Sequence, residues 1–396
     1  MGPCKTRAPF DLAALPLRIR TRGHVRSIQP YSHFRNSFDP LRVPLGSAPI
    51  REFYRLEPYR VDQLMFSSNF CNFNRCSMYP MGTLLNFTGT IALGIVGYNT
   101  WRFITFHLAL YGDRKLDRYT SKNQKTWAIV TGASAGIGLG YAEELITRGF
   151  GVIIFGHKLE ELQQAEIHLR TISDDADVRI IKLDAITASS TDIENALNEF
   201  KQLHITILIN NVGGAVSWPF YKPFTEHTAS EVDNTINLNA RFMAQLTRIL
   251  LPTLSQNSPS LILNMSSGSH MGIPWLCAYS AVKGFNASFS RAISREMKAT
   301  GIAIDSIVVY PGDVHSQANT SGLAPFSPSS RQYAKLALDR VVTAVRQGRN
   351  EMSPFWMHGL SGVLDFMPEF LVQSLTKTSL EGKLKAQEQM MKVKEI

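Results

Sequence analysis

Short apolar runs alternate with longer amphipathic segments from Lys125 to about Gly348. The apolar runs are rich in Val and Ile, and they read "WAIVT", "GVIIF", "VRIIKLD", "ITILINNVG", "SLILNMSS" and "IAIDSIVVYPG". Segments such as "LEELQQAEIHLRTI" and "TDIENALNEFKQL" lie between them and have the periodicity of helices with one apolar face. Strands and helices that alternate at this spacing form parallel sheets joined by right-handed crossovers. The pattern predicts an α/β fold, a doubly wound parallel sheet, over residues 125–350.

The residues before this region have a different pattern. Residues 1–75 are rich in Arg, Pro, Ser and aromatics without periodicity, which predicts a disordered or non-native extension. The 26 residues Cys76–Trp101 then carry no charge, and the apolar "FITFHLALY" follows soon after. Because about 20 helical residues cross the hydrocarbon layer, we expect an N-terminal membrane segment over 76–111. Two asparagines interrupt the run, and a buried helix is the alternative.

Composition and charge exclude several classes of protein. A chain of 396 residues with 44% hydrophobic content can build a large core. Most of its formal net charge of +9 comes from residues 1–80, and no interleaved basic and aromatic pattern follows, so we predict no nucleic-acid partner. The cysteines lack the spacing of zinc ligands and the density of a disulfide framework, so we predict no metal site and a reducing compartment.

A glycine-rich turn, "TGASAGIG", follows the first apolar run, Trp127–Thr131. Gly132 permits a sharp turn, Gly136 lets the backbone approach a pyrophosphate, and Gly138 lets strand and helix pack closely. The helix that begins near Ile137 would present unpaired N–H groups and a positive dipole. The order of strand, turn and helix predicts a Rossmann-type dinucleotide site, whereas the glycines alone could also form a plain tight loop.

The end of the second predicted strand bears on which dinucleotide binds. A site specific for NAD places Asp or Glu there to hold the ribose hydroxyls. The chain instead reads "FGHKLEEL", and His157 with Lys158 offers positive charge. The sequence therefore favours NADP(H) as cofactor, although both residues could also be ordinary surface residues.

The motif "AYSAVKG" places Tyr279 and Lys283 four residues apart, hence on one face of a helix. A lysine ammonium beside a phenol would lower the pKa of the phenol toward the working range and make it a usable acid or base. A second such pair, Tyr111 with Lys115, precedes the glycine turn and has no strand or serine behind it. Context therefore selects Tyr279 and Lys283.

The strand "LILNMSS" ends in two serines upstream of Tyr279, where a hydroxyl could bond a reacting carbonyl oxygen. With "TGASAGIG", "NNVG", "INLNARF", "YSAVK" and "PGDVHS", the set resembles the short-chain dehydrogenase/reductase superfamily. In that family the usual spacing to the tyrosine points to Ser266, while the motif "NMSS" points to Ser267. We take Ser267, because the strand fixes its direction.

The resemblance implies a role for each matching residue. Tyr279 would protonate a carbonyl oxygen, Lys283 would hold the nicotinamide ribose and tune the phenol, Ser267 would bond the carbonyl, and Asn239 would anchor a proton-relay water. Asp184 would contact the adenine. The full set of implied cofactor contacts is Val130, Gly132, Ser134, Gly136, Ile137, Gly138, His157, Lys158, Asp184, Asn211, Tyr279, Lys283, Val314 and Ser316.

A narrower similarity covers about residues 82–396. The motifs "ITILINNVGG", "WAIVTGASAGIG" and "MSPFWMHGL" look like those of the very-long-chain 3-oxoacyl-CoA reductases and the related 17-beta-hydroxysteroid dehydrogenases. This implies NADPH-dependent reduction of a very-long-chain 3-oxoacyl-CoA, as in fatty acid elongation. A ketone of a steroid or secondary metabolite is an alternative, and a non-catalytic NADP-binding scaffold is another. The similarity also implies a homodimer formed by the helices near Asn239 and Tyr279.

The same similarity predicts where the protein is located. The tail over 351–396 is apolar before it becomes Lys-rich, and it could associate with a membrane. The ending "KVKEI" places Lys392 and Lys394 as in the dilysine retrieval signal of endoplasmic reticulum membrane proteins. Basic residues after the apolar segment favour a cytosolic position for the domain that follows. We therefore expect an endoplasmic reticulum membrane protein whose catalytic domain faces the cytosol.

Overall fold

The computed structural model describes residues 79–108, 116–320, 322–359, 362, 364 and 367–394. The extension predicted over residues 1–75 lies outside these residues. So does the second tyrosine–lysine pair, Tyr111 with Lys115.

Seven parallel strands form one sheet in the order β3-β2-β1-β4-β5-β6-β7. The order runs outward in both directions from β1 and β4, which confirms the predicted doubly wound, Rossmann-type sheet. In such sheets a ligand site lies where the order reverses, here between β1 and β4. The strands are β1 (Thr126–Thr131), β2 (Gly151–Gly156), β3 (Val178–Lys182), β4 (His204–Asn210), β5 (Ser260–Met265), β6 (Ile304–Val309) and β7 (Glu351–Met352).

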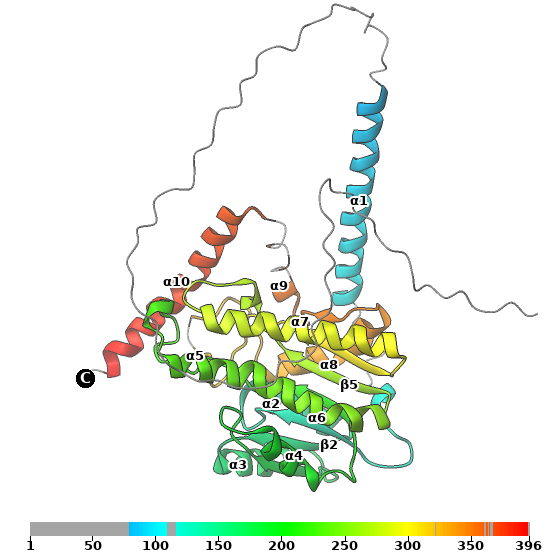
Figure 1. Ribbon diagram of the computed structural model, residues 1–396, viewed down its shortest axis with the longest axis vertical. Helices are drawn as coiled ribbons and strands as arrows, with labels where there is room; N and C mark the ends of the chain where they lie inside the picture. Colours follow the sequence, from blue (N-terminus) through cyan, green and yellow to red (C-terminus); the bar gives the residue numbers. More distant parts are fainter. Residues whose placement is uncertain are drawn as a thin grey trace, which may run out of the picture. The chain divides into compact units, whose positions relative to one another are not determined.

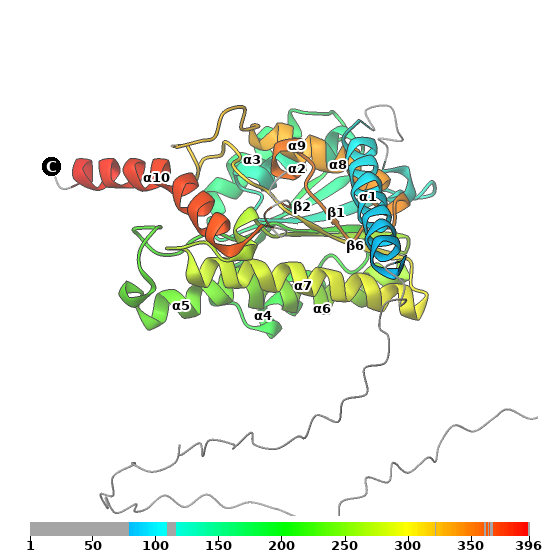
Figure 2. The same cartoon turned by 90° about the horizontal axis from the view of Figure 1, so that it is seen from above.

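Helices cover both faces of this sheet, as Figures 1 and 2 show. One face carries α2 (Gly136–Thr147), α3 (Leu159–Arg170) and α8 (Ser330–Arg346). The opposite face carries α4 (Ser190–Asn198), α6 (Phe242–Gln256) and the long α7 (Cys277–Thr300), with α5 (Ala229–Ile236) preceding α6.

The central strands are buried because both of their faces are covered. Alternate residues of β1 enter the two cores: Ala128 and Val130 pack on the side of α2, and Trp127 and Ile129 pack on the side of α6. This arrangement explains why the strands read as continuous apolar runs instead of alternating ones.

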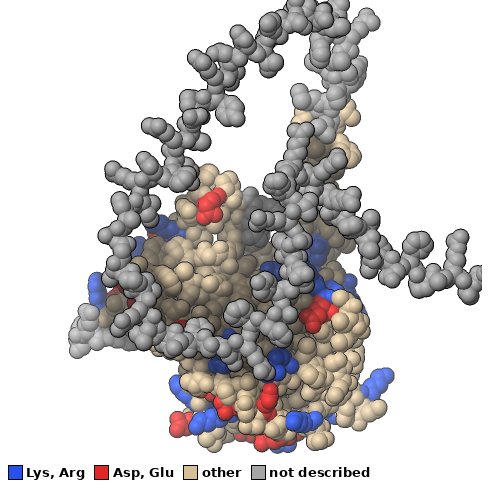
Figure 3. Space-filling model, viewed as in Figure 1, with Lys and Arg blue, Asp and Glu red and all other residues tan. Residues whose placement is uncertain are grey.

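Helix α1 (Tyr79–Leu108) forms over the predicted membrane segment. Its C-terminal end packs on the domain, where Phe106 is buried and Arg349 Nη2 donates to the Arg102 carbonyl at 2.6 Å. Its earlier part exposes apolar side chains such as Leu85 and Leu93, and the visible face there carries no acidic or basic side chain (Figure 3). Among the described residues, no helix has both the length and the apolarity of a membrane span, so the predicted crossing is not confirmed.

Within the described residues of the predicted apolar tail, the structure forms β7, α9 (Trp356–Gly359) and α10 (Glu369–Lys394). β7 extends the sheet at its edge beside β6. His358 in α9 packs on the loop after β6. Its ring lies so close to Gly312 that a Cβ on this glycine would be only 2.6 Å from it. The segment with the sequence "MSPFWMHGL" therefore packs against the "PGDVHS" loop through His358.

Candidate active site

The glycine turn after β1 has the geometry of a phosphate cradle. Gly132 and Gly136 have φ values of +64° and +59°, a region that side-chain-bearing residues rarely adopt. A Cβ on Gly138 would collide with the Gly132 carbonyl, so α2 lies directly against the turn. Because α2 begins at Gly136, its first N–H groups face the end of the sheet. This arrangement fits the pyrophosphate of a dinucleotide.

Asn211 fixes the turn to the end of β4. Its side-chain Nδ2 donates to the carbonyls of Thr131 and Gly132 at 3.0 and 3.2 Å. The Thr131 hydroxyl in return accepts from the backbone N–H groups of Asn211 and Val212 at 2.8 and 3.0 Å. These bonds hold β1 and β4 together where the sheet order reverses. The "NNVG" motif therefore shapes the cradle from beside it.

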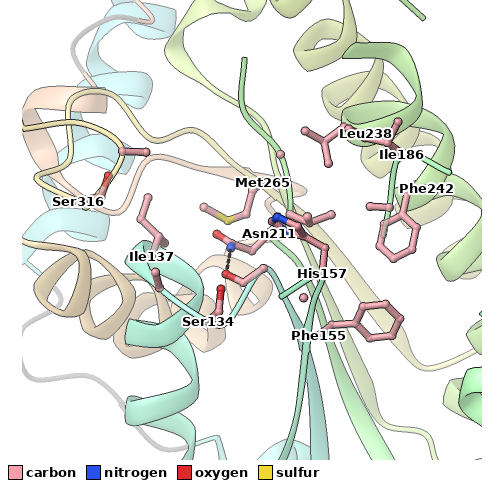
Figure 4. A pocket seen from close by; sticks show the side chains of 18 of the residues that line it. Ser134, Ile137, Phe155, His157, Ile186, Asn211, Leu238, Phe242, Met265 and Ser316 are labelled. Atoms are coloured by element: carbon pink, nitrogen blue, oxygen red, sulfur yellow. Dashed lines mark hydrogen bonds between the residues drawn. The ribbon is translucent and has the colours of Figure 1, made fainter. Parts of the chain in front are cut away.

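A cavity of about 440 Å³ opens at this point, at the carboxyl ends of the strands. Figure 4 shows Asn211 in its middle, with Ser134 and Ile137 on one side and Leu238 and Phe242 on the other. The predicted site residues that line it are Gly132, Ser134, Gly136, Ile137, His157, Asp184, Asn211, Tyr279, Lys283 and Ser316. Dinucleotide and reactive-group candidates therefore share one cavity.

Several residues that were predicted to contact the cofactor do not themselves line the cavity. Val130 is wholly buried within β1, and its side chain packs in the core. Gly138 acts through its close packing on Gly132. Val314 is buried beneath the loop that carries Ser316.

Sequence reasoning missed the apolar wall of the cavity. Its members are Phe155, Leu183, Ile186, Leu238, Phe242 and Met265. They come from strand ends and helix starts, where an apolar residue looks the same as a core residue in the sequence. Arg241 was missed too: its guanidinium donates to the carbonyls of Ala185, Ile186 and Ala188 and holds the turn after Asp184. One oxygen of Asp184 accepts from the Ile186 N–H at 2.8 Å within this turn.

Tyr279 and Lys283 lie one turn apart on α7. Lys283 Nζ is 5.4 Å from the centre of the Tyr279 ring and donates to the Met265 carbonyl at 3.3 Å. Burial lowers the pKa of Lys283 to about 8. Burial also raises the pKa of Tyr279, and a hydrogen bond with Ser267 lowers it only in part. The expected net lowering of the Tyr279 pKa is therefore wrong, because desolvation disfavours both charged forms.

The two serines after β5 point in different directions. The Ser266 hydroxyl donates to the Lys283 carbonyl at 2.8 Å and is buried against α7. The Ser267 hydroxyl accepts from the Ser269 N–H and from the Ser269 hydroxyl at 3.1 and 3.0 Å, and it lies near enough to Tyr279 to lower the pKa of the phenol in part. Ser267 is thus the serine that affects the phenol, whereas Ser266 belongs to the cavity lining, and the choice of Ser267 as the catalytic serine stays a prediction.

Asn239 lies in a π-helical turn, Asn237–Arg241, between α5 and α6. Single π turns inside helices occur frequently at functional sites. Its buried amide accepts from the Gly214 N–H and donates to the carbonyls of Gly214 and Thr235, at 2.9 to 3.0 Å. A Cβ on Gly213 would lie 2.6 Å from Asn239 Oδ1 and 3.0 Å from Lys283 Nζ. Asn239 and Lys283 are therefore neighbours across the end of the "NNVG" loop.

The two basic residues after β2 differ in their surroundings. His157 lines the cavity, but Lys158 Nζ pairs with Glu161 Oε1 at 2.7 Å. The other oxygen of Glu161 accepts from the Ser134 hydroxyl at 3.3 Å. The Glu161 carboxylate thus binds both Lys158 and Ser134, two residues that were predicted to contact the cofactor.

Comparison with known proteins shows which family has this arrangement. The profile described as "short chain dehydrogenase" matches residues 126–324. The chain belongs to the short-chain dehydrogenase family. The resemblance of its motifs to that family is thereby confirmed.

Curated relatives of this short-chain dehydrogenase include reductases and a protein named as inactive. Very-long-chain 3-oxoacyl-CoA reductase-B of Danio rerio is 33% identical over 245 residues, which cover 59% of this chain and 74% of the relative. Very-long-chain 3-oxoacyl-CoA reductase of Neurospora crassa is 30% identical, with coverage of 62% and 73%. Inactive hydroxysteroid dehydrogenase-like protein 1 of Mus musculus is also 30% identical, with coverage of 63% and 74%.

Solved structures of short-chain dehydrogenases share the fold. One from Sphingobium yanoikuyae, in complex with NADPH, has a TM-score of 0.50 at 24% identity and covers 58% of this chain and 88% of that structure. One from Shigella flexneri has a TM-score of 0.52 at 20% identity, with coverage of 58% and 89%.

Proposed function

We propose that this short-chain dehydrogenase is an NADPH-dependent reductase of a ketone on a hydrophobic substrate. The observation that carries the proposal is the shared cavity: Tyr279 and Lys283 border the same space as the Gly132–Gly138 cradle. Two more observations support it. His157 faces the cavity where an NAD-specific site would hold a carboxylate, and the apolar wall suits the rings of a dinucleotide.

NADPH, when bound, supplies the hydride that reduces the carbonyl carbon. The Tyr279 hydroxyl gives its proton to the carbonyl oxygen, and its raised pKa keeps that proton in place at neutral pH. The Ser267 hydroxyl, which lies near the phenol, orients the same oxygen. The Lys283 ammonium stabilises the phenolate that forms, and Asn239, whose amide lies beside it, holds the water that returns the proton.

We propose a very-long-chain 3-oxoacyl-CoA as the substrate, with the 3-hydroxyacyl-CoA as product. Relatives of that name at 30% and 33% identity support this choice. A steroid ketone is the alternative, because the substrate end of the cavity lies in loops without recognisable motifs. The test compares initial rates of NADPH oxidation by the purified protein with 3-oxostearoyl-CoA and with estrone. We expect the acyl-CoA to give the higher kcat/KM, and a preference for estrone would reverse the assignment.

A non-catalytic role is the second candidate. Similarity to an inactive hydroxysteroid dehydrogenase-like protein favours it. Against it, Asn239, Ser267, Tyr279 and Lys283 are all present and lie together. The same assay decides: NADPH binding without oxidation in the presence of either ketone would favour the non-catalytic role.

We also propose attachment to the endoplasmic reticulum membrane on its cytosolic side. The exposed apolar residues of α1, among them Leu85, Phe87 and Leu93, support attachment, as does the exposed Phe370 of α10. After carbonate extraction of cells we expect the protein in the membrane pellet. A tagged Lys392→Ser, Lys394→Ser variant should spread beyond the reticulum. A soluble native protein would contradict the attachment.

A homodimer through α6 and α7 completes the proposal. Phe285 and Phe289 of α7 stack on each other with ring centres 5.8 Å apart, and Phe285 is 44% exposed. A partly exposed aromatic pair on a long helix is suited to a subunit interface. Light scattering should give twice the mass of one chain.

A further inference from the structure

The C-terminal helix α10 makes a buried polar contact far from its own part of the chain. Gln387 is only 5% exposed. Its Oε1 accepts from the Tyr221 N–H at 2.9 Å, and its Nε2 donates to the Tyr221 carbonyl at 2.9 Å. One side-chain amide therefore satisfies both backbone groups of a single loop residue. Such a pair fixes the position of the loop as a neighbouring strand would.

A second contact ties α10 to another loop at the site. Lys383, one turn before Gln387, pairs with Asp313 at 2.7 Å and donates to Asn319 Oδ1 at 3.2 Å. Asp313 and Asn319 flank Val314 and Ser316 of the "PGDVHS" loop. A Cβ on Gly322 would lie 3.3 Å from the Gly382 backbone, so this loop and α10 are in close contact. One face of α10 thus holds two loops.

The loop that Gln387 holds reaches the reactive tyrosine. Burial, the Asp313 carboxylate and the nearby Tyr279 phenol raise the pKa of the Tyr221 phenol to about 12. The Lys222 N–H donates to the Trp275 carbonyl, just before Tyr279, at 3.3 Å. Lys222 Nζ also pairs with Glu231 at 2.8 Å. Residues 221–222 therefore lie between α10 and the segment that leads into α7.

The same loop carries aromatic side chains suited to an apolar substrate. Trp218 and Phe220 form an edge-to-face pair with ring centres 4.9 Å apart. With Tyr221 they form an aromatic group in the segment between the "NNVG" motif and α5. Aromatic side chains bury large apolar areas against a ligand.

We propose that Gln387 is a positioning residue, which fixes the loop from Trp218 to Tyr221 as one wall of the site for the apolar chain of the substrate. The inference rests on the proposed reductase function for its substrate, but the contact itself is independent of that function. α10 then contributes to substrate affinity without touching the reacting atoms.

Gln387→Met tests this, because methionine keeps the length and helix propensity of glutamine but removes both hydrogen bonds. With 3-oxostearoyl-CoA we expect KM to rise about ten- to thirtyfold, because two neutral hydrogen bonds that fix the loop are lost, while kcat stays within about twofold. The Kd for NADPH should not change. Hydrogen exchange at the Tyr221 amide, measured without substrate, should quicken by about tenfold or more. Gln389→Met is the matched control, because Gln389 is exposed on the same helix.

Wild-type KM and wild-type Tyr221 exchange in Gln387→Met would overturn the proposal. So would equal effects in Gln389→Met, since they would mean a general loosening of α10. If the native protein reduces no ketone, the proposed function fails, and the exchange of the Tyr221 amide alone decides whether Gln387 fixes the loop.

Discussion

The dinucleotide end of the cavity and the loop that we propose for the substrate are built in different ways. The dinucleotide end comes from the ends of β1, β2 and β4, which the sheet topology brings together. The proposed substrate loop is held by a contact that joins Tyr221 to Gln387 across 166 positions of the chain. Sheet geometry places the dinucleotide end, whereas side-chain contacts between distant segments place the loop.

This difference teaches where variation is tolerated. At the dinucleotide end a single added carbon at Gly138 meets the Gly132 backbone, which cannot move without disturbing β1. At the substrate end the contacts are side-chain hydrogen bonds, each of which can be exchanged for another. Family membership therefore fixes the dinucleotide end, whereas the loop proposed for the substrate can differ between enzymes with different substrates.

The largest effect is expected from Tyr279→Phe, which removes only the phenolic hydroxyl in the cavity. We expect kcat to fall by about two to four orders of magnitude, because general acid catalysis is lost. The Kd for NADPH should stay near the native value, since Lys283 and the glycine turn remain. Single-turnover kinetics and a dinucleotide titration measure the two. A native rate in this variant would refute the catalytic assignment.

The pair of serines after β5 gives the next largest effect. Ser267→Ala removes the hydroxyl near Tyr279, and we expect kcat to fall by about 10²-fold, as for a lost donor to a reacting oxygen. Ser266→Ala loses a buried bond to the Lys283 carbonyl, so it should lower the free energy of unfolding by about 1 kcal/mol with a much smaller change in kcat. Reversed effects on kcat would make Ser266 the catalytic serine.

The sequence predicted the sheet and most of the dinucleotide end because both depend on local patterns. The glycine turn, Asn211 and the pair of Tyr279 and Lys283 each lie within a short motif. The sign of the net Tyr279 pKa shift was missed, because it depends on burial by distant segments. So was the contact between Gln387 and Tyr221, since a glutamine on a Lys-rich helix looks like any solvated residue.

The pH profile of the reaction tests the role of Lys283, which is proposed both to hold the cofactor and to stabilise the phenolate. Lys283 has a pKa lowered to about 8, so its ammonium is present below pH 8 and is lost above it, while the raised pKa of Tyr279 keeps the phenol protonated. We therefore expect kcat/KM for reduction to fall about tenfold per pH unit above pH 8. Lys283→Arg, whose side chain stays charged, should keep measurable activity and lose this decline. A native profile that is flat from pH 8 to 10 would contradict the role of the ammonium.

The smallest expected effect concerns the cofactor phosphate. Glu161 accepts from Ser134 and pairs with Lys158, so a 2′-phosphate at these residues must compete with a carboxylate for the same donors. Glu161→Gln removes the negative charge and frees the lysine. Because exposed ion pairs are weak, we expect NADPH to bind about two- to fivefold more tightly, while the Kd for NADH, which lacks the phosphate, stays constant.

Glu160→Gln is the matched control, since Glu160 is a neighbouring carboxylate in the same first turn of α3. Titration of cofactor fluorescence at low and high salt gives each Kd, and the gain should shrink at high salt. Weaker NADPH binding in Glu161→Gln would mean instead that the carboxylate orients Lys158 toward the phosphate. Equal native affinities for NADPH and NADH would remove the basis for a phosphate site at this end of the cavity.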